Sequence, residues 1–243
     1  MVSLPLDLFT PEWPLPDGVQ ARFSGRRGGV SAAPYDSFNL GDHVGDDPQA
    51  VAANRAALLA ALPGCDQVQY LTQVHGCDLI PAGANGQPEA DASSVTDTGI
   101  ACAVMTADCL PVLFCDDRGE RVAAAHAGWR GLAAGVLLRT LAAFPDPQRV
   151  SAYLAPAIGP GAFEVGPDVR AAFADAPDAF FVAGQGDRLF ADLAGIARWQ
   201  LKHAGIAAVY GGSLCTFSDS ERFFSYRRDG RTGRQISLIW KTL

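Results

Sequence analysis

The chain has 243 residues, a formal net charge of −7 at pH 7, and 49% hydrophobic residues. This length fits one large domain or two small ones, and the apolar fraction is enough for a sizeable core. The acidic balance argues against nucleic acid as a partner, because proteins that bind nucleic acid usually carry a basic surface. No apolar run approaches the roughly 18 residues that a membrane span needs, so we expect no membrane partner. The first seven residues lack the basic and apolar segments of a secretory signal, and we therefore expect a cytoplasmic protein.

Four segments carry helix signals. Asp46-Asp47-Pro48 predicts the start of a first helix and Pro63-Gly64 predicts its end, since a carboxylate and a proline favour a helix start. The later segments are rich in Ala and Leu or carry apolar residues at helical spacing. The helices are expected over residues 49–62, 131–144, 167–174 and 189–204.

Strand signals are more numerous, and several are continuous apolar runs, which is typical of a sheet buried on both faces. Strands are expected over residues 67–71, 99–105, 111–115, 121–126, 150–155, 179–182, 208–210, 223–226 and 235–240. Asp229-Gly230 predicts a hairpin turn between the last two. Helices and strands follow in mixed rather than alternating order, which favours an α+β fold. No repeat or linker divides the chain, so we expect a single catalytic domain over residues 1–243.

Two histidines and a cysteine stand where predicted strands end. His75 lies in Gln73-Val74-His75-Gly76, Cys109 follows Ala107-Asp108, and His126 ends an apolar run. Two imidazoles and one thiolate are the ligand set of a catalytic zinc, which keeps its fourth position for water or substrate. The three residues are far apart in the chain, so any such site must be assembled by the fold. The six cysteines form no C-x-x-C pair that would predict a zinc ribbon or a redox dithiol.

The same residues also permit a metal-free interpretation, in which Cys109 is a thiolate nucleophile and His126 or His75 its base. The neighbouring Asp108 weighs against it, because a negative charge disfavours the thiolate. Asp108 and Asp91 are candidates for acid–base groups or for carboxylates that orient a metal-bound histidine.

Arginines are the candidates for binding an anion, because a planar guanidinium matches the geometry of phosphate. Arg55 lies on the first predicted helix and Arg130 follows Trp129. Five more arginines gather near the carboxyl end: Arg222, Arg227, Arg228, Arg231 and Arg234. We select Arg55, Arg130 and Arg227 as candidate phosphate-binding residues, together with His43 as a residue that approaches the site.

A series of motifs in fixed order resembles one known family. The motifs are Phe23-Ser24, Gly28-Gly29-Val30-Ser31, Asn39-Leu40-Gly41-Asp42-His43-Val44-Gly45, Asn54-Arg55, Gln73-Val74-His75-Gly76, Ala107-Asp108-Cys109-Leu110-Pro111, His126-Ala127-Gly128-Trp129-Arg130-Gly131, Ile158-Gly159-Pro160 and Phe224-Ser225-Tyr226-Arg227-Arg228. They resemble the laccase-domain (YfiH-like) family, long labelled multicopper polyphenol oxidase and associated with purine nucleoside phosphorylase activity. The resemblance covers about residues 20–240. This chain has Gly161-Ala162 where the family often has a cysteine.

The resemblance implies a fold of two β layers flanked by helices, and it places the family's metal-binding residues on His75, Cys109 and His126. It implies phosphorolysis of adenosine, inosine and methylthioadenosine, with adenosine deamination as a second activity. Purine nucleosides and phosphate are then the expected partners, and zinc the expected metal.

Other functions use the same residues. Oxidase chemistry with several coppers needs many imidazole ligands. The chain has only four histidines, which argues against such chemistry. A single copper at the His/Cys/His set remains compatible with a polyphenol oxidase, because copper binds such ligands at least as tightly as zinc. A cysteine hydrolase or deamidase built on Cys109 and His126, and a non-catalytic protein that binds purines or metal, are the further alternatives.

Overall fold

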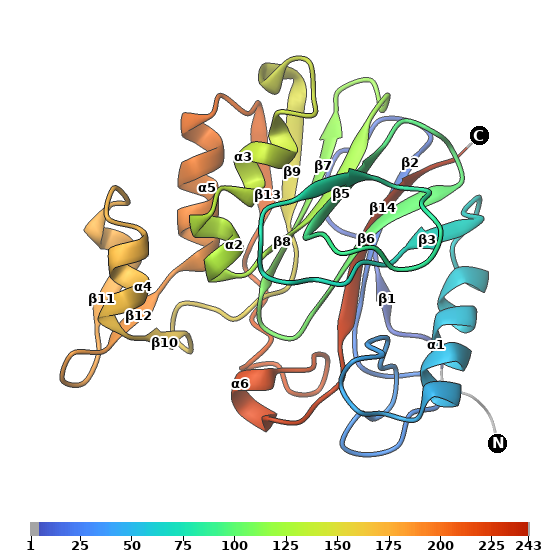
Figure 1. The fold of residues 1–243 in the computed structure, drawn as a ribbon, viewed down its shortest axis with the longest axis horizontal. Coiled ribbons are helices and arrows are strands. Elements are labelled where there is room, and N and C mark those ends of the chain that lie inside the picture. The colour runs from blue at the N-terminus through green and yellow to red at the C-terminus, as the bar shows by residue number, and fades with distance from the viewer. Residues whose placement is uncertain (1–4, 243) are drawn as a thin grey trace.

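The computed structural model describes residues 5–242, and two mixed β-sheets packed face to face form its centre (Figure 1). The first sheet has the strand order β1 (Leu8–Phe9), β2 (Val19–Ser24), β14 (Gln235–Lys241), β6 (Ile100–Thr106) and β3 (Gln67–Gln69). The second has the order β13 (Ala208–Gly211), β9 (Val150–Leu154), β7 (Leu110–Asp116), β8 (Val122–Ala127), β5 (Ala92–Val95) and β4 (Leu79–Pro81).

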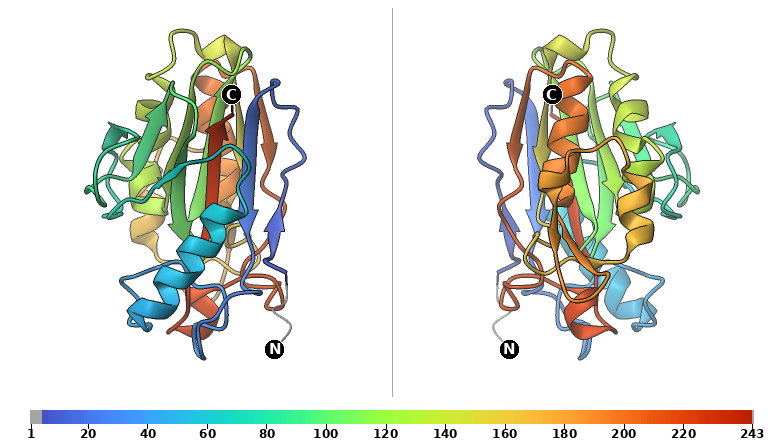
Figure 2. Two further views of the ribbon diagram at one scale, coloured as in Figure 1. Left: turned by 90° about the vertical axis from the view of Figure 1, so that its right-hand side faces the viewer. Right: turned by 90° about the vertical axis from the view of Figure 1, so that its left-hand side faces the viewer.

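Helices cover the outer faces of both sheets. The first sheet carries α1 (Pro48–Ala60), and the second carries α2 (Trp129–Ala133), α3 (Val136–Leu141) and α5 (Leu193–His203). Figure 2 shows α1 on one side of the molecule and α3 and α5 on the other. The remaining helix of this side, α4 (Pro167–Ala172), lies with a small sheet of β10 (Glu164–Val165), β12 (Leu189–Ala191) and β11 (Phe181–Ala183) that projects outward in Figure 1. Two short 3₁₀ turns, Pro147–Arg149 and Asp178–Phe180, and α6 (Tyr226–Asp229) complete the elements.

Three layers of apolar side chains separate these elements and explain the continuous apolar runs. In β6, Cys102 and Val104 point into the space between the sheets, while Ala101, Ala103 and Met105 pack toward α1. Both faces of the strand are therefore buried, which removes the usual alternation of apolar and polar residues. The expected α+β fold with two β layers flanked by helices is confirmed. Within residues 5–242 no helix is long and apolar enough to cross a membrane.

The first helix starts as its sequence predicts. The side chain of Asp47 accepts a hydrogen bond from the backbone N–H of Gln49, and Pro48 takes the first helical position, where no N–H is needed.

Unlike the first helix, three of the predicted elements were wrong. The helix expected over 131–144 is split into α2 and α3 by Gly135, whose φ of 89° is left-handed. The helix expected over 189–204 begins only at Leu193, because Leu189–Ala191 forms β12 and Asp192 then caps α5. The strand over 223–226 and its hairpin are absent from the described chain. Instead, Ser225 caps α6, and the Gln235 side chain bonds both backbone groups of Phe224.

The strands β1, β2, β4, β5 and β10 were missed, whereas the strand expected over 235–240 forms β14 at the centre of the first sheet. The carboxyl-terminal strand β14 lies between β2 and β6 and pairs antiparallel with both. Its Leu238 is fully buried beneath α1.

Leu238→Ala should lower the free energy of unfolding by about 2–5 kcal/mol, because the removed atoms leave a cavity in a packed core. Leu138→Ala is the matched control, since Leu138 on α3 is 45% exposed and its truncation should cost less than about 1 kcal/mol. Urea unfolding measures both. Equal losses would contradict the placement of β14 at the centre of the first sheet.

Candidate metal centre and its pocket

The topology brings the predicted metal-binding residues to one end of the two sheets. Cys109 ends the turn that carries the chain from β6 in the first sheet to β7 in the second. His126 is the penultimate residue of β8 and pairs with Pro111 at the start of β7. His75 lies in the loop that follows β3 and precedes β4.

His75, Cys109 and His126 form one cluster, in which the ligand atoms all lie within 4.8 Å of one another. The Sγ of Cys109 is 3.9 Å from Nε2 of His75, and the two imidazole rings stand edge to face with centroids 4.8 Å apart. A tetrahedral metal with bonds of roughly 2.0–2.3 Å would set its N and S ligands roughly 3.3–3.6 Å apart. A small inward movement of these side chains would meet that geometry, so the donor set and its spacing fit zinc or copper.

Asp91 holds two of the three ligands in place. Its buried carboxylate accepts hydrogen bonds from the consecutive backbone N–H groups of Val74, His75 and Gly76, at 3.2, 3.0 and 2.6 Å. It also lies 2.8 Å from Nδ1 of His126, whose backbone N–H donates to the Asp91 carbonyl at 2.7 Å. Because Asp91 occupies Nδ1, the Nε2 atom of His126 is left for a metal, which is the usual arrangement of a carboxylate behind a metal-bound histidine.

The ligand loops have an unusual backbone. His75 and Asp108 are the non-glycine residues of the described chain with positive φ, at 62° and 94°. Such conformations cost free energy and persist only where surrounding contacts enforce them. Asp91 provides those contacts for His75.

Contacts of the same kind hold Asp108. Its carboxylate accepts hydrogen bonds from the Thr216 hydroxyl at 2.6 Å and the Arg227 backbone N–H at 2.7 Å. Its carbonyl accepts from Ile158 N–H at 2.9 Å. These contacts make Asp108 the residue that fixes the turn on which Cys109 is presented.

Cys109 and His126 form a charged pair in the absence of metal. Burial raises the pKa of Cys109, but the His126 charge and hydrogen bonds from both histidines outweigh it and lower that pKa to about 6. Burial lowers the pKa of His126, but the Cys109 thiolate and Asp91 outweigh it and raise that pKa to about 9. At neutral pH the sulfur is therefore already the thiolate that a metal requires, whereas His126 must release a proton to coordinate.

Gly128 leaves the space that the ligands share. A Cβ atom at this position would lie 2.9 Å from Cys109 Sγ, 3.1 Å from His75 Cδ2 and 3.5 Å from His126 Nε2. The absence of a side chain here therefore keeps the point between the three ligands open.

The cluster opens into a pocket of about 360 Å³. Its walls are His43, Gln73, His75, Met105, Thr106, Ala107, Cys109, His126, Tyr226 and Arg234. Thr106, Tyr226 and Gln73 were missed by sequence reasoning, and Arg234 was noticed only as one of five clustered arginines. The role of Gln73 is visible only in the structure. Its side-chain amide donates to the Met105 carbonyl and accepts from the Met105 backbone N–H, each at 2.8 Å.

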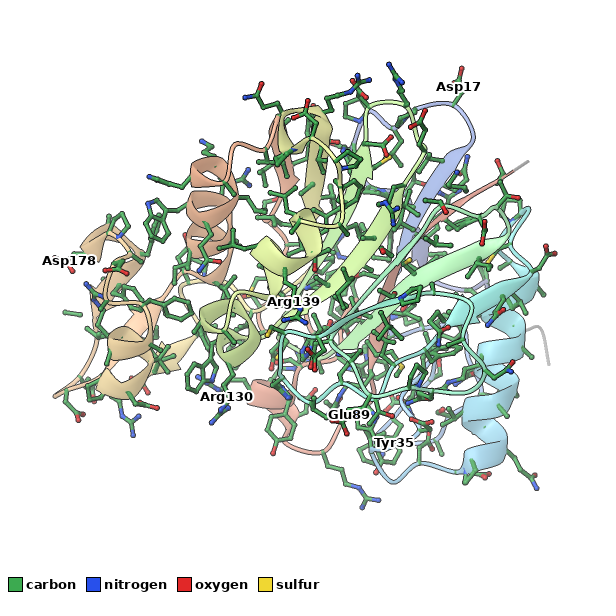
Figure 3. The ribbon with its side chains drawn as sticks, turned by 45° about the horizontal axis from the view of Figure 1, so that its top comes forward. Asp17, Tyr35, Glu89, Arg130, Arg139 and Asp178 are labelled. Carbon is green, nitrogen blue, oxygen red and sulfur yellow. The ribbon has the colours of Figure 1, made fainter. Side chains whose placement is uncertain are left out.

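The structure places His43 in the pocket but Arg55, Arg130 and Arg227 outside it. Arg55 donates to the Leu40 carbonyl and lies 3.3 Å from Asp42. Arg227 donates to the Glu164 carbonyl at 2.9 Å. Arg130, labelled beside α2 in Figure 3, stacks on the Trp129 ring with its Cζ 4.3 Å from the centroid. Burial and the nearby charge of Arg234 lower the pKa of His43, which is consequently neutral at pH 7.

Comparison with known proteins gives matches over almost the whole chain. The family model described as multi-copper polyphenol oxidoreductase laccase matches residues 20–242. YfiH of Escherichia coli, named purine nucleoside phosphorylase, is 51% identical over 240 residues, which cover 96% of this chain and 98% of that protein. A Pseudomonas aeruginosa protein named purine nucleoside phosphorylase is 52% identical over 236 residues, covering 95% and 97%.

Solved structures agree with the fold. A Neisseria meningitidis protein of 48% identity superposes with a TM-score of 0.93, covering 98% of this chain and 100% of that one. YlmD of Geobacillus stearothermophilus, at 29% identity, gives a TM-score of 0.87 with coverage of 98% and 100%.

Asp91→Asn should weaken zinc binding by about 10–100-fold, because the neutral amide no longer stabilises His126 in the orientation and tautomer that coordination needs. Competition against a chelator measures the affinity. Asp78→Asn is the control, since Asp78 ends the His75 loop before β4 and its 75% exposed side chain contacts only Arg139 as an ion pair. An unchanged zinc affinity in the Asp91 variant would remove the organising role from this carboxylate.

Gly128→Ala should also lower zinc affinity, in this case by about fivefold or more, because the added methyl group presses on the sulfur ligand and costs at least roughly 1 kcal/mol of strain. Gly161→Ala is the matched control, since no atom lies within 4 Å of a Cβ built there. The same chelator competition reports both variants, and equal affinities would mean that the ligands do not converge beside Gly128.

Proposed function

The chain belongs to the multi-copper polyphenol oxidoreductase laccase family, and from this premise we propose that it is a zinc-dependent purine nucleoside phosphorylase. Its substrates would be adenosine, inosine and methylthioadenosine, together with inorganic phosphate. The observation that carries the proposal is the His/Cys/His cluster at the base of a pocket, in a chain about half identical to proteins named purine nucleoside phosphorylase.

Phosphorolysis exchanges one bond at the sugar for another. A phosphate oxygen bonds to the anomeric carbon while the bond from that carbon to the purine nitrogen breaks. The electron pair of the broken bond leaves with the purine, which takes up a proton, so the products are the free base and the sugar 1-phosphate. An enzyme must hold phosphate, sugar and base in line, because positioning accounts for much of the rate of such transfers.

Several of the described residues would contribute to that positioning. His75, Cys109 and His126 would hold the zinc, and Asp91 and Asp108 fix the loops that carry them. A bound zinc ion supplies a Lewis acid with a free coordination position. The pocket offers the exposed ring of Tyr226, the neutral imidazole of His43 and the guanidinium of Arg234 to the substrates.

We propose adenosine deamination as a side activity of the same pocket. In that reaction water replaces the amino group on the purine ring, giving inosine and ammonia. Deamination reacts at the amino-bearing carbon of the purine and phosphorolysis at the anomeric carbon of the sugar, and both reactions would use the pocket beside the cluster.

The family's copper label fits this chain poorly. Three of its four histidines line the pocket, while His203 lies on α5 with Nδ1 bonded to the Trp199 carbonyl. Residues 5–242 contain one group of three potential ligands. This supports one metal ion, and zinc rather than several coppers.

A cysteine hydrolase or deamidase is the second candidate, and the charged Cys109–His126 pair favours it, because a thiolate beside an imidazolium is how such enzymes prepare their nucleophile. Catalytic turnover that survives complete removal of metal would identify such a metal-free cysteine enzyme. The cytoplasmic location and the single catalytic domain stay predictions.

A product assay with adenosine tests the proposed function. With phosphate, the zinc-loaded protein should release adenine and ribose 1-phosphate, and without phosphate it should release at most inosine. Cys109→Ala should depress both reactions by more than about a hundredfold, since loss of a ligand costs more than loss of an outer partner. Cys77→Ala, two residues from His75 but outside the cluster, is the control. A wild-type protein that consumes no purine nucleoside under either condition would refute the proposal.

A further inference from the structure

Two polar groups of the pocket have capacity for hydrogen bonds that the protein leaves unused. They are the guanidinium of Arg234, which directly precedes β14, and the hydroxyl of Thr106, which ends β6. The strands β14 and β6 are neighbours, and Thr106 pairs with Gln235. Both groups therefore stand at the same strand ends.

The side chain of Arg234 is held firmly but is only partly used. Its Nη1 donates to the carbonyls of Thr232 and Gly233 at 3.1 and 3.0 Å. Its backbone N–H donates to the Asn39 side chain, and its Cγ would lie 2.7 Å from a Cβ at Gly41. Across residues 5–242 no carboxylate lies within ion-pair distance of Arg234, and its Nε and Nη2 groups make no hydrogen bond. The guanidinium is therefore fixed in position and has no carboxylate bonded to it.

The hydroxyl of Thr106 is the second group of the pocket with unused hydrogen-bonding capacity, and it is uncharged. The residue is 2% exposed, and its Oγ1 finds no hydrogen-bond partner in the described chain. Buried hydroxyls are nearly always hydrogen-bonded, so an unpaired one in the wall of a pocket indicates a partner that arrives with the ligand. A hydroxyl can donate to an anion, as a guanidinium does.

The pocket contains no competing carboxylate among its described walls. The whole chain carries a net charge of −7, so attraction for an anion must come from local groups rather than from the overall field. A fixed guanidinium with free N–H groups matches the geometry of phosphate oxygens.

We infer that Arg234 and Thr106 form the subsite that binds inorganic phosphate in this pocket. The inference rests on the proposed phosphorylase function and assigns its second substrate a place. It replaces Arg55, Arg130 and Arg227, whose contacts lie elsewhere, as the residues that hold phosphate.

Calorimetric titration of the zinc-loaded protein with inorganic phosphate tests this assignment without requiring turnover. Arg234→Gln should weaken phosphate binding by about 10–100-fold, the range expected for loss of charge-assisted hydrogen bonds. Arg234→Lys should recover part of the affinity, because the charge returns without the planar fork. In steady-state assays the KM for phosphate should rise in parallel, with the KM for the nucleoside changed much less.

Thr106→Val separates binding from folding. Because the hydroxyl has no partner in the protein, valine should leave thermal stability unchanged or higher, while phosphate binding weakens several-fold. Thr106→Ser retains the hydroxyl and should retain the affinity.

Arg198→Gln is the matched control for the arginine. Arg198 on α5 also donates to two backbone carbonyls, those of Val209 and Gly211, but lies outside the pocket. Its loss should affect stability and leave phosphate affinity as in the wild type.

Two outcomes would overturn the subsite. The first is wild-type phosphate affinity in Arg234→Gln, with phosphorolysis intact. The second is a protein that binds adenosine 5′-monophosphate through Arg234 but does not bind free phosphate. That result would mean that Arg234 binds the phosphate group of a nucleotide instead. If wild-type protein binds phosphate through Arg234 and Thr106 yet performs no phosphorolysis, the subsite stands and the proposed function fails.

Discussion

The hydrogen bonds of the Asp91 carboxylate connect the parts of the chain on which the candidate site depends. One buried side chain binds three consecutive amides of the His75 loop and the imidazole of His126, at distances of 2.6–3.2 Å. The left-handed backbone of His75 is tolerable because those amides are satisfied in that conformation. A carboxylate in this place also occupies Nδ1, which leaves Nε2 for a metal once His126 has released its second proton, so loop geometry and metal chemistry follow from the same contact.

The stacked sheets bring the third ligand to this pair. The turn from β6 to β7 crosses from one sheet to the other, and Cys109 stands at its end, beside the start of β7 and the end of β8. Asp108 holds this crossing to Ile158, Thr216 and Arg227, which come from the later part of the chain. Residues from both sheets and from the carboxyl-terminal segment therefore share one pocket, and the two residues with strained backbones are both anchored by carboxylates.

The sequence predicts the layers and the cluster better than it predicts the elements and the pocket walls. Continuous apolar runs indicated sheets buried on both faces, and the residue types at strand ends indicated a metal. The helix expected over 131–144 is broken because Gly135 is left-handed, and Asp192 marks a helix start where an apolar pattern suggested an interior. Arg234 could not be separated from its neighbours by residue type, since only its position beside β14 brings it into the pocket while Arg227 turns to the Glu164 carbonyl. Burial of a hydroxyl without a partner, as in Thr106, is a property of packing that no sequence pattern carries.

One metal held by one sulfur and two imidazoles is the central claim, and it separates this chain from the copper label of its family. X-ray absorption at the zinc edge of the purified, zinc-loaded protein tests it most directly. We expect a first coordination shell with a single sulfur at about 2.3 Å and nitrogen or oxygen atoms at about 2.0–2.1 Å. The sulfur contribution should vanish in Cys109→Ala. A shell of nitrogen and oxygen alone in the wild type, or one with two or more sulfurs, would contradict it.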